Sequence, residues 1–310
     1  MKVLITPRSF PKSGQAAYAL LREKGFEVID NNTGKSLTEE EMIKMCADVD
    51  GLIVGVDPVT RTVMEHAKNL KAISKYGAGL DNVDLDAAKE LGIAVDRAAG
   101  TNAVSVAEHA VGLFFSLARS VVPTAMSTKN GEWGREQGVE LFGKTAGIVG
   151  LGNIGKNVAR MCKGIGMNIL GFDPYLPADD PSIAEYGVKL VSLEELFREA
   201  DFISLHSPLT DETANMINKD SLATMKKTAC IVNTARGGLV NEDDLYEALK
   251  NGTIKAVAED VFSTEPPAKD NKLVALPNFV LTSHIGAFTA EANQKMALKS
   301  AENLVRMICG

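Results

Sequence analysis

The sequence has few cysteines, and nothing in their placement indicates a metal site. The four, Cys46, Cys162, Cys230 and Cys309, are scattered along 310 residues without the short spacings of metal ligands. Cys162 and Cys230 stand in apolar segments, so we expect both in the core. Such cysteine usage is typical of a reduced cytoplasm, which is where we expect the protein.

The sequence also lacks a dense run of Lys or Arg and an apolar stretch of membrane-spanning length. Its formal net charge of −7 argues against a nucleic-acid partner. Residues 1–8 indicate a short strand and a turn, not a signal peptide. With 45% hydrophobic and 24% charged residues, the composition is that of an ordinary globular chain, long enough for two domains. We therefore expect neither a nucleic-acid nor a membrane role.

What the sequence does contain is a repeated alternation of short apolar runs with helical patterns. In the first hundred residues this predicts strands at 2–6, 26–29, 51–55, 71–74 and 93–95, with helices near 12–24, 38–47, 61–68 and 84–91. A second alternation predicts strands at 145–149, 168–172, 189–191, 202–205, 230–233, 255–258 and 279–282, with helices that include 193–199, 242–250 and 289–308. Such alternation is typical of parallel sheets with helices on both faces.

A long helix is predicted from about residue 104 to residue 129, with a kink at Pro123. Before the kink its polar or small residues fall on one narrow stripe: Ser105, Glu108, His109, Gly112, Ser116, Arg119 and Ser120. A helix that is apolar on most sides must be covered on most sides. We expect a second copy of the chain to cover part of it, which predicts a homodimer. The alternative is burial within one large domain.

The most informative segment is the run Gly150-Leu151-Gly152-Asn153-Ile154-Gly155. An apolar run precedes it, a helical pattern from 154 to 165 follows it, and Asp173 ends the next apolar run. In a dinucleotide-binding turn the glycines let backbone approach the pyrophosphate at a helix N-terminus. Asp173 would bind the adenosine ribose hydroxyls and repel a 2′-phosphate, which favours NAD over NADP. The alternative is an ordinary tight turn.

Three chemically suggestive residues follow strands of the second alternation, namely Arg236, Glu265 and His284. Histidine is the natural proton donor for the reduction of a 2-oxo acid near neutral pH. Glu265 would hold the other imidazole nitrogen, and Arg236 would clamp the substrate carboxylate and polarise the carbonyl. Taken alone, each residue has an alternative: a surface ion pair, a solvated loop acid and a structural histidine. His206 also ends a strand and rivals His284 as the proton donor.

Several segments together resemble the D-isomer-specific 2-hydroxyacid dehydrogenases over essentially the whole chain. They are Gly77-Ala78-Gly79-Leu80-Asp81-Asn82-Val83-Asp84, Ser105-Val106-Ala107-Glu108, the glycine run at 150–155, residues 233–238, Asp260-Val261-Phe262 with Glu265-Pro266, and Ser283-His284-Ile285-Gly286. The resemblance implies an α/β fold of two Rossmann-like, doubly wound parallel-sheet domains with a cleft between them. Residues 1–98 plus 287–310 would form a discontinuous substrate-binding domain, and residues 99–286 the NAD-binding domain.

The resemblance also implies the roles of individual residues. Arg236, Glu265 and His284 would be the catalytic trio, and Asp260 would contact the nicotinamide carboxamide. Substrate contacts would come from Tyr76, Gly77, Ala78, Gly79 and Arg236. Cofactor contacts would come from Gly150, Gly152, Asn153, Ile154, Gly155, Asp173, His206, Ser207, Pro208, Thr213, Thr234, Ala235, Asp260 and Gly286. This places His206 beside the cofactor and not in the role of proton donor. His66 and His109 are interpreted as helix-surface or interface residues with no assigned chemistry.

The substrate is left open between phosphorylated and unphosphorylated acids. The motif wording is most similar to D-3-phosphoglycerate dehydrogenases, which favours 3-phosphoglycerate and serine biosynthesis. Relatives that bind the phosphate often bring an Arg from the loop after the strand at 51–55, where this chain has Asp57, which would repel phosphate. Arg8, Lys75 or Arg135 of a partner subunit would compensate. Hydroxypyruvate or glyoxylate is the alternative substrate.

Two further expectations concern regulation and class. The chain has no room after Gly310 for the regulatory domain of longer phosphoglycerate dehydrogenases, so we expect no serine feedback through it. Some proteins of this fold are NAD-binding transcriptional corepressors that retain the same trio, so a binding role without turnover stays the alternative of a different class.

Overall fold

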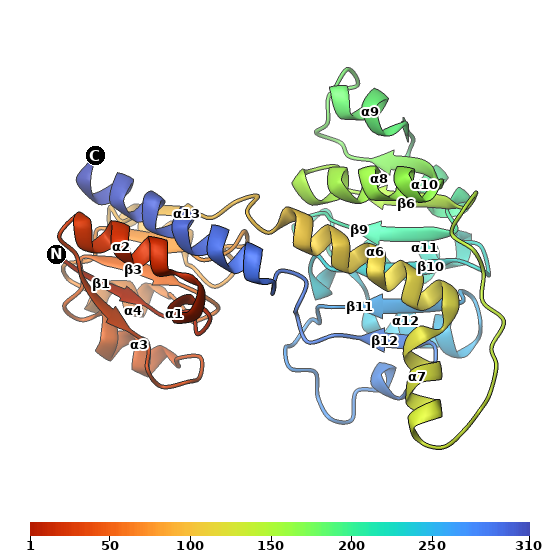
Figure 1. Ribbon diagram of the computed structural model, residues 1–310, viewed down its shortest axis with the longest axis horizontal. Coiled ribbons are helices and arrows are strands. Elements are labelled where there is room, and N and C mark those ends of the chain that lie inside the picture. Colours follow the sequence, from red (N-terminus) through yellow and green to blue (C-terminus); the bar gives the residue numbers. More distant parts are fainter. The chain divides into compact units, whose positions relative to one another are not determined.

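The computed structural model describes all 310 residues, which divide into two compact units, residues 1–102 with 287–310, and residues 103–286. Each unit is one parallel sheet with helices packed on both of its faces (Figure 1). The predicted α/β class with two parallel-sheet domains is therefore confirmed.

The first unit has the strand order β2-β1-β3-β4-β5, with every neighbouring pair parallel. Its strands are β1 (Lys2–Ile5), β2 (Glu27–Asp30), β3 (Gly51–Val54), β4 (Ala72–Lys75) and β5 (Ala94–Arg97). Its helices are α1 (Phe10–Ser13), α2 (Gln15–Glu23), α3 (Glu39–Cys46), α4 (Arg61–His66), α5 (Leu85–Glu90) and α13 (Ala290–Cys309). Every β3 residue is buried because helices cover both faces, which explains its continuous apolar sequence.

The last helix, α13, belongs to the first unit although it ends the chain. Its residues Ala297, Ala301 and Leu304 are fully buried in one core cluster with Val3 and Ile53. Thr289 caps its N-terminus by accepting a hydrogen bond from the amide of Ala292. The C-terminal segment therefore completes a sheet that the N-terminal segment begins.

The second unit has the strand order β12-β11-β10-β9-β6-β7-β8, again all parallel. Its strands are β6 (Thr145–Val149), β7 (Asn168–Phe172), β8 (Val188–Leu190), β9 (Phe202–Leu205), β10 (Cys230–Asn233), β11 (Ala256–Glu259) and β12 (Phe279–Leu281). The strand order reverses at β6, which lies between β7 and β9. In open α/β sheets, ligands bind beyond the carboxyl ends of the strands at such a reversal.

The helices of the second unit form two layers around this sheet. They are α6 (Ala103–Arg119), α7 (Val121–Lys129), α8 (Asn153–Ile165), α9 (Pro181–Tyr186), α10 (Leu193–Glu199), α11 (Lys219–Thr224) and α12 (Glu242–Lys250), with short 3-10 turns η1 (Gly237–Leu239) and η2 (Leu273–Ala275). Cys162 and Cys230 are fully buried, as predicted, and Cys46 is buried as well. Burial raises the pKa of the Cys162 thiol to about 12.

The long helix predicted over 104–129 is two helices, and the predicted kink at Pro123 is wrong. The break falls at Ser120, whose φ of 48° is left-handed, and α6 and α7 meet there at 65°. Pro123 lies in the first turn of α7, where a missing amide proton costs no hydrogen bond.

Burial along α6 does not follow the polar stripe. Ser105 and Ser116 of the polar stripe are buried, whereas Val104 and Phe115 are exposed. Ala107, Ala110 and Phe114 are fully buried in a core cluster of the helix's own unit. The alternative of burial within one domain therefore explains most of this helix.

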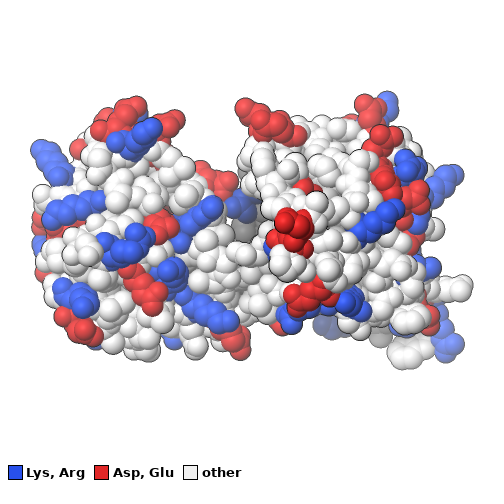
Figure 2. All heavy atoms as spheres, turned by 90° about the horizontal axis from the view of Figure 1, so that it is seen from above, with Lys and Arg blue, Asp and Glu red and all other residues white.

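The predicted strands at 145–149, 168–172, 202–205 and 230–233 match the observed bounds, and the others differ by one or two residues at an end. Lys and Arg lie among Asp and Glu across the face drawn in Figure 2, without an extended region of one sign.

Candidate functional site

The glycine run forms the turn between β6 and α8 at the strand-order reversal. Gly150 has a φ of 92°, and a Cβ there would lie 2.8 Å from the backbone carbon of His206. A Cβ at Gly155 would lie 1.9 Å from the Gly150 carbonyl oxygen, so only glycine lets α8 pack this close. A Cβ at Gly152 would meet nothing within 4 Å, which leaves open space at the helix N-terminus. Asn153 begins α8, and Ile154 packs against its core.

Asp173 follows β7 and is tied directly to this turn. One carboxylate oxygen accepts a hydrogen bond from the Leu151 amide at 2.8 Å, and the other accepts from the Tyr175 amide at 2.9 Å. The half-buried carboxylate therefore stands beside the glycine turn, where the adenosine ribose of a bound dinucleotide would lie.

Two buried polar atoms near the carboxyl edge of this sheet have no partner in the protein. They are Thr234 Oγ1, after β10, and His206 Nδ1, after β9. Buried polar atoms normally have hydrogen-bond partners. Two buried polar atoms without a protein partner at this edge are therefore consistent with a site for a polar ligand. With the open space at Gly152, the residues present fit NAD.

His206 is unsuited to donate a proton. Its Nε2 lies 2.8 Å from Ser204 Oγ, and burial lowers the pKa of the imidazole to about 3. The ring is therefore neutral across the physiological range. Ser207 and Pro208 continue this turn, and Thr213 Oγ1 donates a hydrogen bond to the Pro208 carbonyl at 2.7 Å.

Asp260, directly after β11, is the centre of a buried network. It accepts hydrogen bonds from Thr282 Oγ1 and from the amides of Ile285 and Gly286, at 2.5, 2.9 and 2.8 Å. His109 Nε2 lies 3.1 Å from Thr282 Oγ1 and 3.4 Å from Asp260 Oδ1. Burial alone would raise the pKa of Asp260, but these hydrogen bonds together hold it below its ordinary value.

His109, which the sequence analysis gave no chemistry, makes a tertiary hydrogen-bond contact in the structure. Its partner Thr282 is 173 residues away in the sequence, so only the fold reveals the contact. His66, in contrast, is an exposed helix residue whose Nδ1 contacts the Thr62 carbonyl in its own segment.

Arg236 lies on a turn whose backbone is hydrogen-bonded to the side chain of the buried Asn233. Asn233 Nδ2 donates to the Arg236 carbonyl at 2.9 Å, and its Oδ1 accepts from the Ala235 amide at 3.0 Å. The next residue, Gly237, packs against the loop after β11. Only glycine fits there, because a Cβ would lie 1.9 Å from the Phe262 backbone carbon. The Arg236 turn and the loop that carries Glu265 are therefore in direct contact.

Glu265 and His284 form a hydrogen-bonded pair. Glu265 Oε2 lies 2.7 Å from His284 Nδ1, while Glu265 Oε1 accepts from the Phe262 amide at 3.1 Å. His284 has a left-handed φ of 54°, and its amide donates to the Asp260 carbonyl at 2.9 Å. The carboxylate thus occupies Nδ1 and leaves Nε2 as the nitrogen that can carry a proton to another molecule.

Glu259 is a buried acid beneath this region that the sequence did not single out. It is 1% exposed, and Asn233 Nδ2 donates to its Oε1 at 3.4 Å. Burial, together with the nearby Glu242, raises the pKa of the carboxyl to about 8, against the lowering effect of the Asn233 hydrogen bond. Glu259 is therefore protonated at neutral pH in the folded protein.

Replacing Glu259 by glutamine should make the protein less sensitive to alkaline pH. A folded pKa of about 8 against the ordinary 4.5 means that the folded state binds more protons, so the free energy of unfolding of the parent falls as the pH rises between these values. Glutamine keeps the carbonyl oxygen but has no proton to lose, so the variant should gain stability relative to the parent, by roughly 4 kcal/mol at pH 8 and little at pH 5. Urea unfolding of both proteins at the two pH values measures this.

The control for this experiment is Glu247→Gln on the exposed face of α12. The difference in the free energy of unfolding between this control and the parent should be the same at both pH values. If the difference in the free energy of unfolding between Glu259→Gln and the parent does not change with pH, Glu259 is ionised in the folded protein.

In the first unit, the segment 76–79 follows β4 as a bend. Gly77 has a φ of 136°, and Ala78 and Gly79 complete the bend. The Tyr76 hydroxyl accepts from Ser9 Oγ at 3.1 Å and lies 3.2 Å from the Asn293 carbonyl oxygen, which ties the bend to the start of α1 and to α13. The amides of Gly77, Ala78 and Gly79 donate to no protein atom. Successive free amides of this kind bind anions.

Asp57, which the sequence analysis expected to repel a substrate phosphate, does not present its carboxylate to solvent, and the repulsion stays a prediction. Asp57 is 2% exposed, and its carboxylate accepts from Thr6 Oγ1 at 2.5 Å and from the Leu37 amide at 2.7 Å. Lys75 is buried too, and its Nζ donates to the Gly55 carbonyl and to Asn82 Oδ1. Both side chains are therefore committed to the structure of the first unit.

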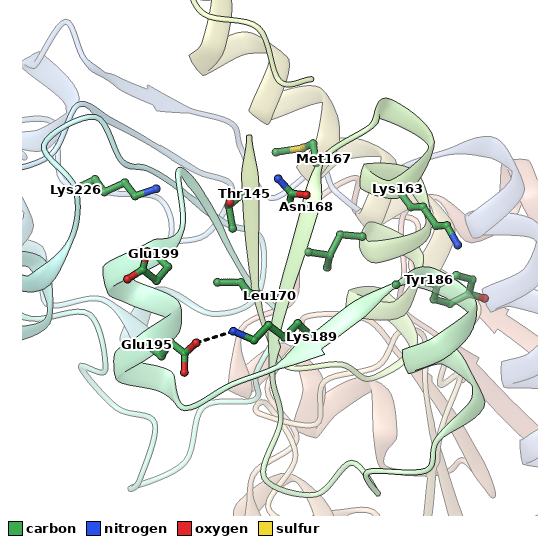
Figure 3. Close-up of a pocket in the computed structure, with 12 residues that line it drawn as sticks. Thr145, Lys163, Met167, Asn168, Leu170, Tyr186, Lys189, Glu195, Glu199 and Lys226 are labelled. Carbon is green, nitrogen blue, oxygen red and sulfur yellow. Dashed lines mark hydrogen bonds and ion pairs between the residues drawn. The ribbon is translucent and has the colours of Figure 1, made fainter. Parts of the chain in front are cut away.

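One cavity lies elsewhere, at the amino ends of β6 and β7. It has a volume of about 660 Å³ and is lined by Thr145, Asn168 and Lys189, among others. Figure 3 shows Lys189 reaching Glu195 across its wall, an ion pair of 3.0 Å. Because Thr145 begins the strand whose far end leads into Gly150, this cavity is at the edge of the sheet opposite to the glycine turn.

Comparison with known proteins agrees with this geometry. Residues 111–286 match the family model described as the NAD-binding domain of D-isomer-specific 2-hydroxyacid dehydrogenases. The chain is 46% identical to a D-3-phosphoglycerate dehydrogenase of Methanocaldococcus jannaschii over 92% of its own length but 54% of the relative's, so it spans about half of that protein. It is 42% identical to a hydroxypyruvate reductase of Thermotoga maritima over 96% of this chain and 95% of the relative. A solved structure from Thermus thermophilus superposes with a TM-score of 0.89 at 37% identity, over 100% of this chain and 97% of the other.

Proposed function

Because the chain belongs to the D-isomer-specific 2-hydroxyacid dehydrogenase family, we propose that it transfers hydride between NAD and a small 2-hydroxy or 2-oxo acid. The observation that carries the proposal is the 2.7 Å contact between Glu265 and His284 in the unit that holds the glycine turn.

The residues divide the reaction between them. When bound, the reduced nicotinamide supplies the hydride that forms the new C–H bond. His284 Nε2 gives a proton to the oxo oxygen, which becomes the hydroxyl, while Glu265 holds Nδ1. Arg236 binds the substrate carboxylate and polarises the carbonyl, and the amides of the 76–79 segment bind the same carboxylate.

We propose the remaining contacts by family membership and by their place in the structure. Residues 1–98 with 287–310 would bind the substrate, and residues 99–286 would bind NAD. The NAD contacts would come from Gly150, Gly152, Asn153, Ile154, Gly155, Asp173, His206, Ser207, Pro208, Thr213, Thr234, Ala235, Asp260 and Gly286. Asp260, whose oxygens already receive several donors, would contact the nicotinamide carboxamide.

The first choice of substrate is 3-phosphohydroxypyruvate, the oxidised partner of 3-phosphoglycerate. The similarity to a D-3-phosphoglycerate dehydrogenase supports it, as does the burial of Asp57 away from solvent. Arg61 is already paired with Glu90 at 2.8 Å, whereas Arg8, directly after β1, is exposed and makes no ion pair. We therefore propose Arg8 as a cation of the first unit that binds the phosphate, and Arg135 of the partner subunit as the other candidate.

Hydroxypyruvate is the second candidate substrate. The similarity to a hydroxypyruvate reductase extends over 95% of that protein and favours it. The two candidates differ only by the phosphate, so one assay distinguishes them.

Oxidation of NADH with a series of 2-oxo acids tests the proposed function. The series is 3-phosphohydroxypyruvate, hydroxypyruvate, glyoxylate and pyruvate. We expect steady turnover, with the highest kcat/KM for 3-phosphohydroxypyruvate. A higher value for hydroxypyruvate selects the second candidate. The absence of turnover with every acid would contradict the enzyme proposal and support a binding role.

Replacing Asp173 by alanine should narrow the preference for NADH over NADPH by at least about tenfold in kcat/KM. The carboxylate would repel the 2′-phosphate of NADPH, and the substitution removes that charge. Comparison of both coenzymes with the parent and the variant measures the change. A parent that already prefers NADPH would contradict the role of Asp173.

We propose that the chain forms a homodimer through the region around α7. No residue of α7 is buried, and Val121, Met126 and the following Trp133 are 52%, 63% and 81% exposed. Contiguous apolar surface of this kind is typical of a protein interface. Light scattering should give twice the chain mass of 33.1 kDa, and Met126→Asp should lower it, whereas Leu91→Asp, at an exposed apolar residue of the first unit, should not. A parent mass of one chain would contradict the dimer.

No single helix is long and apolar enough to cross a membrane, and only the bent pair α6 and α7 reaches the length and composition required. We propose the cytoplasm as the location, which fits four cysteines that are all free thiols.

A further inference from the structure

The orientation of the 76–79 segment depends on one side chain from the neighbouring strand. Arg97 is the last residue of β5 and pairs in register with Lys75, the last residue of β4. Its Nη1 donates a hydrogen bond to the Ala78 carbonyl at 2.9 Å.

This hydrogen bond determines the direction of an amide. The Ala78 carbonyl and the Gly79 N–H belong to the same planar trans peptide, in which the two groups point in opposite directions. Fixing the carbonyl toward Arg97 therefore turns the Gly79 N–H away from β5. That amide is among those that donate to no protein atom.

Arg97 is itself held in place by the C-terminal helix. Its carbonyl accepts from the side chain of Asn303 at 2.9 Å, and Asn303 is 2% exposed. On the preceding residue, Asp96 is ion-paired with Arg306 of the same helix. The guanidinium thus extends from a backbone that α13 fixes, and arginine can keep a planar donor on a carbonyl more precisely than a flexible lysine.

We propose that Arg97 is a positioning residue that orients the Ala78–Gly79 peptide, so that its N–H faces the substrate carboxylate. The proposal rests on the proposed function, because it takes the 76–79 amides as the carboxylate site. Arg97 acts on substrate binding through the peptide and does not take part in hydride or proton transfer. Its charge also adds to the attraction for an anion at this bend.

The test compares Arg97→Met and Arg97→Ala with the parent, using the best 2-oxo acid from the substrate series. We expect KM for the acid to rise about tenfold, with kcat within about twofold and KM for NADH unchanged, because the lost interaction serves ground state and transition state alike. Millimolar guanidinium chloride should lower KM of Arg97→Ala toward the parent value. Arg61→Met, which removes a cation of the first unit that is ion-paired with Glu90, should leave KM unchanged.

Two results would overturn the proposal while the parent is active. One is a parent-like KM for the acid in Arg97→Met. The other is a KM for NADH that rises as much as KM for the acid, together with a lower thermal midpoint and no rescue by guanidinium. That result would make Arg97 a stabilising residue only. A parent without turnover on any acid would instead contradict the proposed function, so the two failures are distinguishable.

Discussion

Replacing His284 by glutamine should lower kcat by at least about a hundredfold while leaving the affinity for NADH within about twofold. Glutamine offers an amide N–H near the position of Nε2 but cannot give up a proton at neutral pH. The loss should therefore appear in the chemical step and not in coenzyme binding. Steady-state kinetics with saturating NADH, together with NADH fluorescence titration, separates the two.

The geometry gives His284 this role over the other histidines. Glu265 lies 2.7 Å from its Nδ1, whereas His206 has no carboxylate partner and a pKa that burial lowers to about 3. His66→Gln, on the exposed surface of α4, is the matched control and should keep the parent rate. A parent-like kcat in His284→Gln would mean that another group supplies the proton.

Replacing Arg236 by glutamine should have the second large effect, a loss of about a thousandfold in kcat/KM for the 2-oxo acid. The guanidinium presents a fork of donors that matches a carboxylate, and one of them is directed at developing charge on the carbonyl. Both KM and kcat should therefore worsen. Arg236→Lys keeps the charge but not the fork, so it should recover only part of the loss.

The Arg236 prediction depends on a turn that is fixed without the side chain. The Asn233 side chain donates a hydrogen bond to the Arg236 carbonyl at 2.9 Å, and the close packing of Gly237 against the Phe262 backbone fixes the next residue. The variant should therefore fold normally. Arg198→Gln, at an exposed ion pair on α10, is the control for loss of one cation from the same unit. A change in kcat/KM of less than tenfold in Arg236→Gln would place the carboxylate elsewhere.

Much of the sheet structure could be predicted because its strands are buried on both faces. Continuous apolar runs such as Gly51–Val54 and Ala146–Val149 are typical of such strands, and the glycines and the acid at 173 then indicate a nucleotide-binding turn. The break at Ser120 was missed because a serine at positive φ has no signal in the sequence, whereas Pro123 has a strong one that the first turn of a helix tolerates.

The site was predictable residue by residue but not contact by contact. Glu265 and His284 stand 19 residues apart, and their order suggested a pair. Asp57 was read as facing a ligand because it follows a strand, but its hydrogen bonds to Thr6 and Leu37 come from elements 51 and 20 residues away. Arg97, Glu259 and His109 were missed for the same reason, since each acts through a tertiary contact that no local pattern encodes.

A crystal structure with NADH and oxamate, a 2-oxo acid analogue, measures the central claim most directly. We expect NADH at the Gly150–Gly155 turn and His284 Nε2 within about 3.2 Å of the oxamate oxygen that replaces the oxo group. An imidazole out of hydrogen-bond reach of that oxygen, or a glycine turn without coenzyme at saturating NADH, would contradict the account.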